Sequence, residues 1–595
     1  MDKPTPKGAI SCSNCRHRKT RCNRSLPRCE RCASCGLSCV YPERRPRGKR
    51  KGRKPAVPDH SSTLALILER LQRVEAQSSV REASLGSTTP TANHSSSPAS
   101  ATLQCQPCGS SGEIRTPILV EPLEPRNACS PSTLDATSML SSAMCDVQRL
   151  RKKRIAGPKE LVTEGINITP DTARSWVKNY FTKMSPKIFP SLKDPKLIDE
   201  KLMYFMPDLI TMDHVQVDAC ILVIYYCILW QGCFRLDDSS SSFSTRDPQI
   251  IRQILICCLR AVSVWQREAT GSITDFIAAM FMTQTAAENL DYGLSWEMHK
   301  HACMYAQGLH LHSLDGDGAL GASGVATSDE GRVNMWNLVQ LDLFHRLINN
   351  KPPAFPFDLN KWRVNLPCLA FDSAPGRDEA VPAMAFLARS RITLVLISFF
   401  QALETLNNDG GGDALSTIQP LCMQVEQVFE EWRIEEWLGS SHSDSLNEWS
   451  ISELALSGYT CVLFMLGRAT LLGRNEGQPP LDSSDMIPKS DLSMRAARKV
   501  VDIVYHMVHV ARLPGPESLS CALGTYRAYV AYAHLASGLA SDPDAVTAPD
   551  NLLRLKQFAE CVQSVAGSER EFMPLARALE AVYNSVETMV PRVWP

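Results

Sequence analysis

The sequence has few of the features that mark membrane-spanning or secreted proteins. Its longest uninterrupted apolar run, Ala219–Trp230, holds only 12 residues, whereas a membrane-spanning helix needs about 20. The first segment, Met1–Lys7, is polar and contains two prolines, so it lacks the apolar stretch of a signal peptide. Alternating strand-like runs bounded by turn residues are also scarce. We therefore expect a soluble, intracellular protein that is rich in helices and has no membrane partner.

Net charge is absent only as an average over the whole chain, which holds 63 Lys and Arg and 63 Asp and Glu. Residues 1–60 hold 17 Lys and Arg against 4 Asp and Glu, so this end carries +13 and the remainder −13. A basic segment attached to a mildly acidic body is typical of a nucleic-acid-binding head on a larger domain.

Cysteine is concentrated in the same basic segment, where residues 12–39 hold seven of the 22 in the chain. In a reducing compartment such a cluster favours a metal site over disulfide bonds. Six of the seven form two copies of one pattern, offset by 17 residues: Cys12, Cys15 and Cys22, then Cys29, Cys32 and Cys39. Two tetrahedral zinc ions need about eight ligand positions, which six thiolates fill if two of them bridge both ions.

Two alternatives concern the same cysteines. A four-cysteine ribbon built from the two Cys-x2-Cys pairs would leave Cys22 and Cys39 without a role. Cys35 stands outside the repeat, and we expect it to be a free thiol rather than a substitute ligand or a redox-sensitive site.

The segment CSNCRHRKTRCNRSLPRCERCASCGLSCVYP, residues 12–42, resembles the binuclear zinc cluster (Zn2Cys6) of fungal transcription factors. It has that family's six cysteines, its Arg/Lys run and its loop proline, Pro27. The resemblance implies two zinc ions, with Cys12 and Cys29 as the bridging thiolates. It also implies that a short helix after Cys15 enters the major groove of double-stranded DNA at a CGG-like triplet.

The same resemblance assigns the basic side chains. Arg18 and Lys19 would lie at the base edges, and their donors suit the O6 and N7 acceptors of guanine. The other basic residues would mainly contact phosphate; they are Arg16, His17, Arg21, Arg24, Arg28 and Arg31.

Three segments follow the predicted zinc-cluster domain (1–42). Residues 43–58 are a basic strip with eight Lys and Arg between Arg44 and Lys54. This strip predicts a nuclear localisation signal; a phosphate-tracking arm or a degraded AT-hook, which lacks its Gly-Arg-Pro core, are the alternatives. Residues 59–77 predict a short coiled-coil dimerisation helix, whose alternative is a helix lying on the large domain. Its apolar positions are Leu64, Ile67, Leu71 and Val74.

Residues 78–158 predict a disordered Ser/Thr/Pro-rich linker, because Ser84–Thr102 holds ten Ser and Thr, two Pro and no aromatic residue. A second basic cluster, residues 149–154, falls within it. From residue 159 to 595 apolar residues recur at helical spacing, which predicts a large all-α domain. The helical segments are Val217–Trp230, Ile250–Trp265, Ile273–Ala287, Val333–Ile348, Met384–Leu403, Met423–Leu438, Ile451–Leu472, Ala496–Val510 and Leu552–Val565.

The large domain resembles the fungal-specific transcription factor (middle homology) domain, which implies a regulatory role. The residues that carry this resemblance are Gly308, Leu309, His310, Glu330, Arg332, Trp336, Asp342, Arg346, Pro352, Pro353, Leu366 and Pro367. Asn337 and Lys351 depart from the family pattern. For Asp342 and Arg346, four residues apart, we expect an ion pair. For the acidic-aromatic stretch Glu426–Trp437, core packing is favoured over transcriptional activation.

Four histidines and one cysteine on a predicted helix of the large domain and at its end predict no second metal site, because they show no repeated ligand spacing. They are His299, His301, Cys303, His310 and His312. No motif joins a nucleophile to a base, so we expect no enzyme activity.

The sequence thus favours a nuclear, sequence-specific RNA polymerase II transcription factor. We expect a pathway-specific activator of a secondary-metabolite gene cluster, acting as a homodimer with the transcription machinery and a small-molecule effector. The alternatives are a ligand-responsive regulator of primary metabolism or stress genes, a helical ligand-binding or enzymatic protein with an appended zinc module, and an RNA-binding or chromatin adaptor.

Overall fold

A computed structural model of the chain divides into two units, Met1–Ser96 and Ser97–Pro595. The described residues are 12–18, 20, 22–23, 25, 28–40, 136–156, 166, 168–184, 198–233, 248–315, 329–355, 362–367, 377–408, 413–439, 445–472 and 487–590. The predicted basic strip, the predicted dimerisation helix and residues 78–135 of the predicted linker lie outside them. In the smaller unit the described elements are two short helices, α1 (Ser13–His17) and α2 (Glu30–Ser34).

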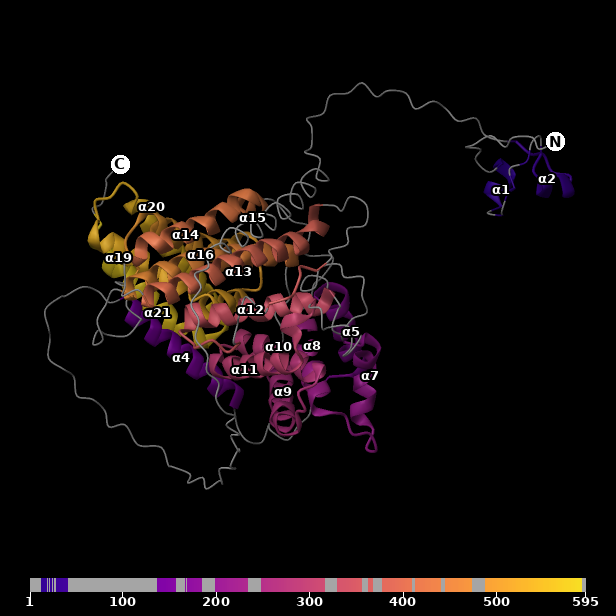
Figure 1. Cartoon of the computed structure of the whole chain (residues 1–595), viewed down its shortest axis with the longest axis horizontal. Helices are drawn as coiled ribbons and strands as arrows, with labels where there is room; N and C mark the ends of the chain where they lie inside the picture. Colours follow the sequence, from indigo (N-terminus) through magenta and orange to yellow (C-terminus); the bar gives the residue numbers. More distant parts are fainter. Residues whose placement is uncertain are drawn as a thin grey trace, which may run out of the picture. The chain divides into compact units, whose positions relative to one another are not determined.

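In the described part of the larger unit every regular element is helical (Figure 1). This agrees with the helical character predicted for the large domain. The α-helices are α4 (Ala136–Ala156), α5 (Pro170–Asn179), α7 (Glu200–Thr211), α8 (Ala219–Gly232), α9 (Pro248–Glu268), α10 (Ile273–Glu288), α11 (Tyr292–Gly308), α12 (Asp329–Asn349), α13 (Arg377–Asn408), α14 (Ala414–Glu431), α15 (Ile434–Leu438), α16 (Ser445–Leu471), α17 (Asp491–Tyr505), α18 (Gly515–Leu519), α19 (Ala528–Ser541), α20 (Ala548–Ser568) and α21 (Met573–Glu587). Short 3-10 or π turns cover Tyr180–Met184, Leu311–Ser313, His506–Val510, Ser520–Thr525 and Arg570–Phe572.

Each segment predicted from apolar spacing overlaps a helix, and one of them is interrupted. The predicted segment Met423–Leu438 is divided between α14 and α15, because Arg433 adopts a left-handed backbone conformation with φ 54°. Val425, Val428 and Phe429 of α14 are buried, so core packing accounts for the apolar side of this acidic-aromatic stretch.

Helix α16 lies at the centre of the main core and contacts α12, α13, α14 and α17. Its Gly458 lets α14 approach closely, since a Cβ there would lie 2.3 Å from Cζ of Phe429. By length and composition alone, α13 and α16 could cross a membrane, but 72% of each apolar stretch is buried inside the domain. Their burial among other helices explains this apolar composition.

Local sequence also fixes where helices begin. Ser272 and Asp275 form a reciprocal capping box at the start of α10, and Ser490 and Ser493 form another at the start of α17. In each box the first hydroxyl accepts a hydrogen bond from the backbone amide three residues later, which satisfies one of the free amides of the first turn.

Helix α4 corrects the predicted domain boundary, because residues 136–156 were assigned to the linker. Its Leu140, Met144 and Val147 are at most 3% exposed and belong to the main core. The helix packs against α19 and α21. The prediction of a linker over residues 136–156 is therefore wrong, and the helical domain begins by Ala136 rather than at residue 159.

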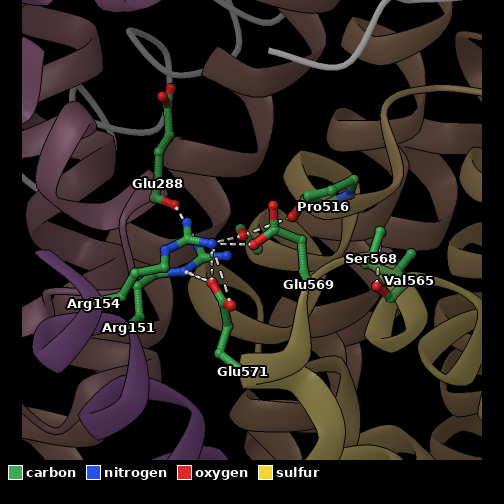
Figure 2. A network of polar contacts seen from close by, with 9 residues as sticks. Arg151, Arg154, Glu288, Pro516, Val565, Ser568, Glu569 and Glu571 are labelled. Carbon is green, nitrogen blue, oxygen red and sulfur yellow. Dashed lines mark hydrogen bonds and ion pairs between the residues drawn. The ribbon is translucent and has the colours of Figure 1, made fainter. Parts of the chain in front are cut away.

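The basic cluster at the end of α4 holds this helix in place (Figure 2). Nε of Arg151, a residue 6% exposed, lies 3.2 Å from Oε1 of Glu571, and its Nη1 donates to Ser520 Oγ at 2.8 Å. Arg154 pairs with Glu569 and also reaches Glu571. Burial alone would raise the pKa of Glu571, but the charges of Arg151 and Arg154 outweigh it and lower that pKa.

Candidate metal centre

The two halves of the head repeat the same local structure. Sγ of Cys12 accepts a hydrogen bond from the backbone amide of Cys15 at 3.5 Å, just where α1 begins. Sγ of Cys29 accepts from the amide of Cys32 at 3.4 Å, at the start of α2. The first thiol of each half therefore caps the helix that follows it, and the 17-residue sequence repeat is a structural repeat as well.

The four cysteines of the two Cys-x2-Cys pairs enclose one small volume. Sγ of Cys12 lies 3.8 Å from Sγ of Cys29 and 3.7 Å from Sγ of Cys32. Sγ of Cys15 lies 3.7 Å from Sγ of Cys29. In a tetrahedral zinc site with Zn–S bonds of about 2.3 Å, neighbouring sulfurs are about 3.8 Å apart. The spacing of these thiols therefore fits zinc, and the group Cys12, Cys15, Cys29 and Cys32 is suited to holding a metal ion.

The third cysteine of each half lies beside this group. Sγ of Cys22 is 3.9 Å from Sγ of Cys12, and Sγ of Cys39 accepts a hydrogen bond from the amide of Cys29 at 3.3 Å. Both are partly buried against the other four. Cys35, in contrast, is exposed, and its Sγ lies 3.9 Å from Ser34 Oγ. The structure brings the six repeat cysteines together and leaves Cys35 outside.

Without a cation the central thiols favour their protonated form. At Cys12 the hydrogen bond from the Cys15 amide favours the thiolate, but burial and the neighbouring thiols outweigh it and raise the pKa to about 12. At Cys29 the hydrogen bond from the Cys32 amide likewise favours the thiolate, but burial and the neighbouring thiols again outweigh it and raise the pKa. Since zinc binds the thiolate, metal binding must displace these protons, and the domain gains folding free energy from the metal.

The contacts that close the head around the thiols could not be predicted from cysteine spacing. The amide of Ser13 donates to the carbonyl of Val40 at 2.9 Å, which joins the two ends of the head. Oδ1 of Asn23 accepts from the amide of Glu30 at 3.2 Å. Gly36 takes φ 63° after α2, a conformation in which glycine is favoured, and a glycine just past a helix is a usable sequence signal.

Of the predicted DNA-contacting residues, the described side chains are solvent-exposed. His17 ends α1, and Arg18 follows it with its amide donating to the carbonyl of Asn14 at 3.0 Å. Arg28 and Arg31 are exposed in the second half. The predicted contacts Lys19, Arg21 and Arg24, the loop residue Pro27 and the side chain of Arg16 lie outside the described part of the chain.

Comparison with known proteins concerns the same N-terminal region. Residues 10–48 match the fungal Zn(2)-Cys(6) binuclear cluster domain. Over 65 residues, 11% of this chain, the sequence is 38% identical to "Transcription factor FUP7" of Fusarium proliferatum (strain ET1). The chain spans 26% of the length of that relative. No solved structure matches the chain.

The repeat of cysteines, the thiol spacing that suits zinc and the match over this segment agree with one another. Residues 10–48 of this chain are a fungal Zn(2)-Cys(6) binuclear cluster domain, which binds two zinc ions.

Proposed function

We propose that the chain is a sequence-specific DNA-binding transcription factor that acts in the nucleus on genes transcribed by RNA polymerase II. The observation that carries this proposal is a thiol cluster with zinc spacing and exposed basic side chains around it. The net charge of +13 over residues 1–60 supports a polyanionic partner. Similarity to a protein named as a transcription factor points the same way.

In this proposal all six repeat cysteines are zinc ligands, and Cys12 and Cys29 bridge the two ions. The central position of these two supports the assignment. Sγ of Cys12 lies within 3.9 Å of the sulfurs of Cys22, Cys29 and Cys32. Cys29 contacts sulfurs from both halves of the head. Its own sulfur lies near the sulfur of Cys12, and its backbone amide donates a hydrogen bond to the sulfur of Cys39.

DNA recognition is assigned to the segment that follows α1 in the sequence. Arg18 and Lys19 contact the guanine edges of a CGG-like triplet in the major groove, where bidentate donors suit the O6 and N7 acceptors. The remaining basic residues contact phosphate and position the head; they are Arg16, His17, Arg21, Arg24, Arg28 and Arg31. The strip 43–58 serves nuclear import.

The helical domain is proposed to be the regulatory part, of the middle homology type. Residues of that resemblance join α12 to its flanking loops: Arg332 pairs with Asp315 at 2.6 Å, and Nε1 of Trp336 donates to the carbonyl of Asn365 at 3.3 Å. The expected ion pair between Asp342 and Arg346 is not formed; the guanidinium of Arg346 instead lies 3.9 Å from the ring centroid of Phe400.

We further propose that the chain works as a homodimer through Leu64, Ile67, Leu71 and Val74. Its proposed role is that of an activator of a secondary-metabolite gene cluster, in contact with the transcription machinery and responsive to a small-molecule effector. The basis for this role is the layout of a zinc-cluster head, a basic strip and a large helical domain.

Two single variants test the assignment of DNA contacts. Lys19→Ala should reduce the preference for CGG-containing over scrambled DNA by about 1–3 kcal/mol. Arg24→Ala, the matched control, should weaken both DNAs alike and reduce the salt dependence of binding by about one counterion. Fluorescence anisotropy titrations at several salt concentrations measure both quantities. Equal losses on both DNAs for both variants would contradict the assignment.

A further inference from the structure

Helices α11 and α12 bring four metal-ligand types of side chain together in the core of the helical domain. His299 and Cys303 lie four residues apart on α11, and Asp342 and His345 lie three residues apart on α12, so each pair shares one face of its helix. All four residues are at most 5% exposed. Spacing along the sequence predicted no metal site here, because the two pairs belong to different helices.

Three ligand atoms of this cluster converge. Nε2 of His299 lies 3.3 Å from Oδ1 of Asp342 and 3.3 Å from Sγ of Cys303. All three atoms lie within 4.8 Å of one another. With Zn–N and Zn–O bonds of about 2.0–2.2 Å and a Zn–S bond of about 2.3 Å, tetrahedral geometry separates such ligand atoms by about 3.4–3.6 Å. The observed separations are close to those of a zinc site.

The charges of the cluster also call for a cation. Oδ1 of Asp342 accepts from the amide of Ala354 at 2.9 Å. In the described part of the chain no Lys or Arg forms a direct ion pair with this buried carboxylate, although the charge of Arg346 acts on it from one turn along α12. Burying a carboxylate without a direct ion pair costs folding free energy. One divalent cation would balance the Asp342 carboxylate and a Cys303 thiolate. Burial and the Asp342 charge raise the pKa of Cys303, so this thiol stays protonated until a cation displaces its proton.

Two imidazole nitrogens at this place have no hydrogen-bond partner among the described residues. They are Nδ1 of His299 and Nε2 of His345, both in residues at most 5% exposed. The two rings lie side by side, with centroids 5.1 Å apart. A buried polar atom without a partner needs an explanation. A cation on Nε2 of His299 would leave Nδ1 of that ring unpartnered, so these two atoms show that the cluster is incompletely satisfied and do not locate the ion.

We infer that His299, Cys303 and Asp342 bind one divalent zinc-type cation between α11 and α12, next to the ring of His345. Imidazole and thiolate donors select zinc or cobalt over magnesium and calcium. A buried site of this kind would join the two helices and add to the stability of the helical domain. It is separate from the zinc ions of the head and does not depend on DNA binding.

Metal analysis of the purified full-length chain tests this inference. The wild-type chain should carry about three zinc ions, two in the head and one in the helical domain. Cys303→Ala should carry about two, whereas Cys561→Ala, the matched loss of a buried thiol in α20, should keep about three. Circular dichroism establishes that both variants keep their helices.

A cobalt experiment separates the two kinds of site. In a Cys12→Ser, Cys29→Ser chain loaded with cobalt, the thiolate-to-cobalt absorption of one site should remain, and adding Cys303→Ala should remove it. About two zinc ions in the wild-type chain, unchanged by Cys303→Ala, would overturn the inference. The cluster would then be a hydrogen-bonded His–Asp pair, and the proposed DNA-binding function would be unaffected.

Discussion

His534 is a buried histidine whose surroundings make the helical domain sensitive to acid. It is 0% exposed in α19, and its Nε2 lies 3.0 Å from Oγ of Ser493. The Ser493 hydroxyl donates to the carbonyl of Pro488 and accepts from the amide of Ser490, which leaves its second lone pair to accept from a neutral His534. Burial, together with the charge of Lys489, lowers the pKa of His534 from 6.5 to about 4.

The lowered pKa predicts a loss of stability on acidification. Below pH 6.5 His534 becomes protonated in the unfolded chain, whereas in the folded chain it stays neutral until the pH falls to about 4. The contribution of neutral His534 to the unfolding free energy is therefore complete above pH 6.5 and is lost as the pH falls from 6.5 to about 4. His534→Gln should remove this contribution. Between about pH 7 and pH 5 the wild-type chain should lose about 2 kcal/mol more unfolding free energy than the variant. Denaturant titrations followed by circular dichroism measure both; an identical pH dependence would refute the account.

Residue spacing predicted one of the two cysteine-containing clusters and could not predict the other. The repeat cysteines of the head recur within 28 positions at a fixed interval of 17, so their pattern is visible in the sequence. His299 and Asp342 are 43 residues apart on different helices. Their contact exists only because α11 packs on α12, and no local pattern encodes that packing.

At the scale of elements, α4 is a packed helix that the spacing of apolar residues was not sufficient to predict. Leu140, Met144 and Val147 follow helical spacing, but the next position of the stripe is Arg151, in a basic run that is typical of solvated chain. The structure buries this arginine because Glu571 and Ser520 satisfy it. Long apolar helices such as α16 were predictable, whereas a helix docked through a buried charge was not.

Removing the buried arginine should therefore loosen α4. Arg151→Met leaves the buried Glu571 with Arg154 as its remaining cationic partner, and breaking such a pair costs about 3 kcal/mol. Arg149→Met is the matched control, since Arg149 is exposed and pairs with the nearby Asp146; it should cost at most about 1 kcal/mol. Denaturant unfolding and protease cleavage within α4 measure the difference. Equal behaviour of the two variants would refute the claim that the Arg151–Glu571 contact holds α4 in place.

A double variant gives a second test of the Arg151–Glu571 ion pair. Replacing both partners, Arg151→Met with Glu571→Gln, should recover part of the stability lost by Arg151→Met alone, because no unpaired buried charge then remains. Additive losses would mean that packing of the arginine stem, rather than its charge, holds the helix.

At the scale of the whole molecule, the short triplet proposed as the target of one head favours paired heads. A triplet read at about 1–3 kcal/mol per base pair cannot distinguish a target from a genome of competing sites. Replacing Leu64, Ile67, Leu71 and Val74 with Ser in the full-length chain should abolish any preference for a fixed half-site spacing and keep single-triplet binding. Selection of bound sequences from random DNA decides this. A wild-type chain that selects isolated triplets without spacing preference would rule out the proposed dimerisation helix.

The central claim is that a two-zinc cluster in residues 10–48 makes this chain a reader of CGG-like DNA. The most direct measurement is the affinity of the full-length chain for CGG-containing and scrambled duplexes, before chelation, after chelation and after zinc is restored. We predict a clear preference for the CGG duplex that chelation removes and zinc restores, because the metals supply the folding energy of the head. Equal affinity for both duplexes, or a preference that survives loss of zinc from the head, would contradict the account.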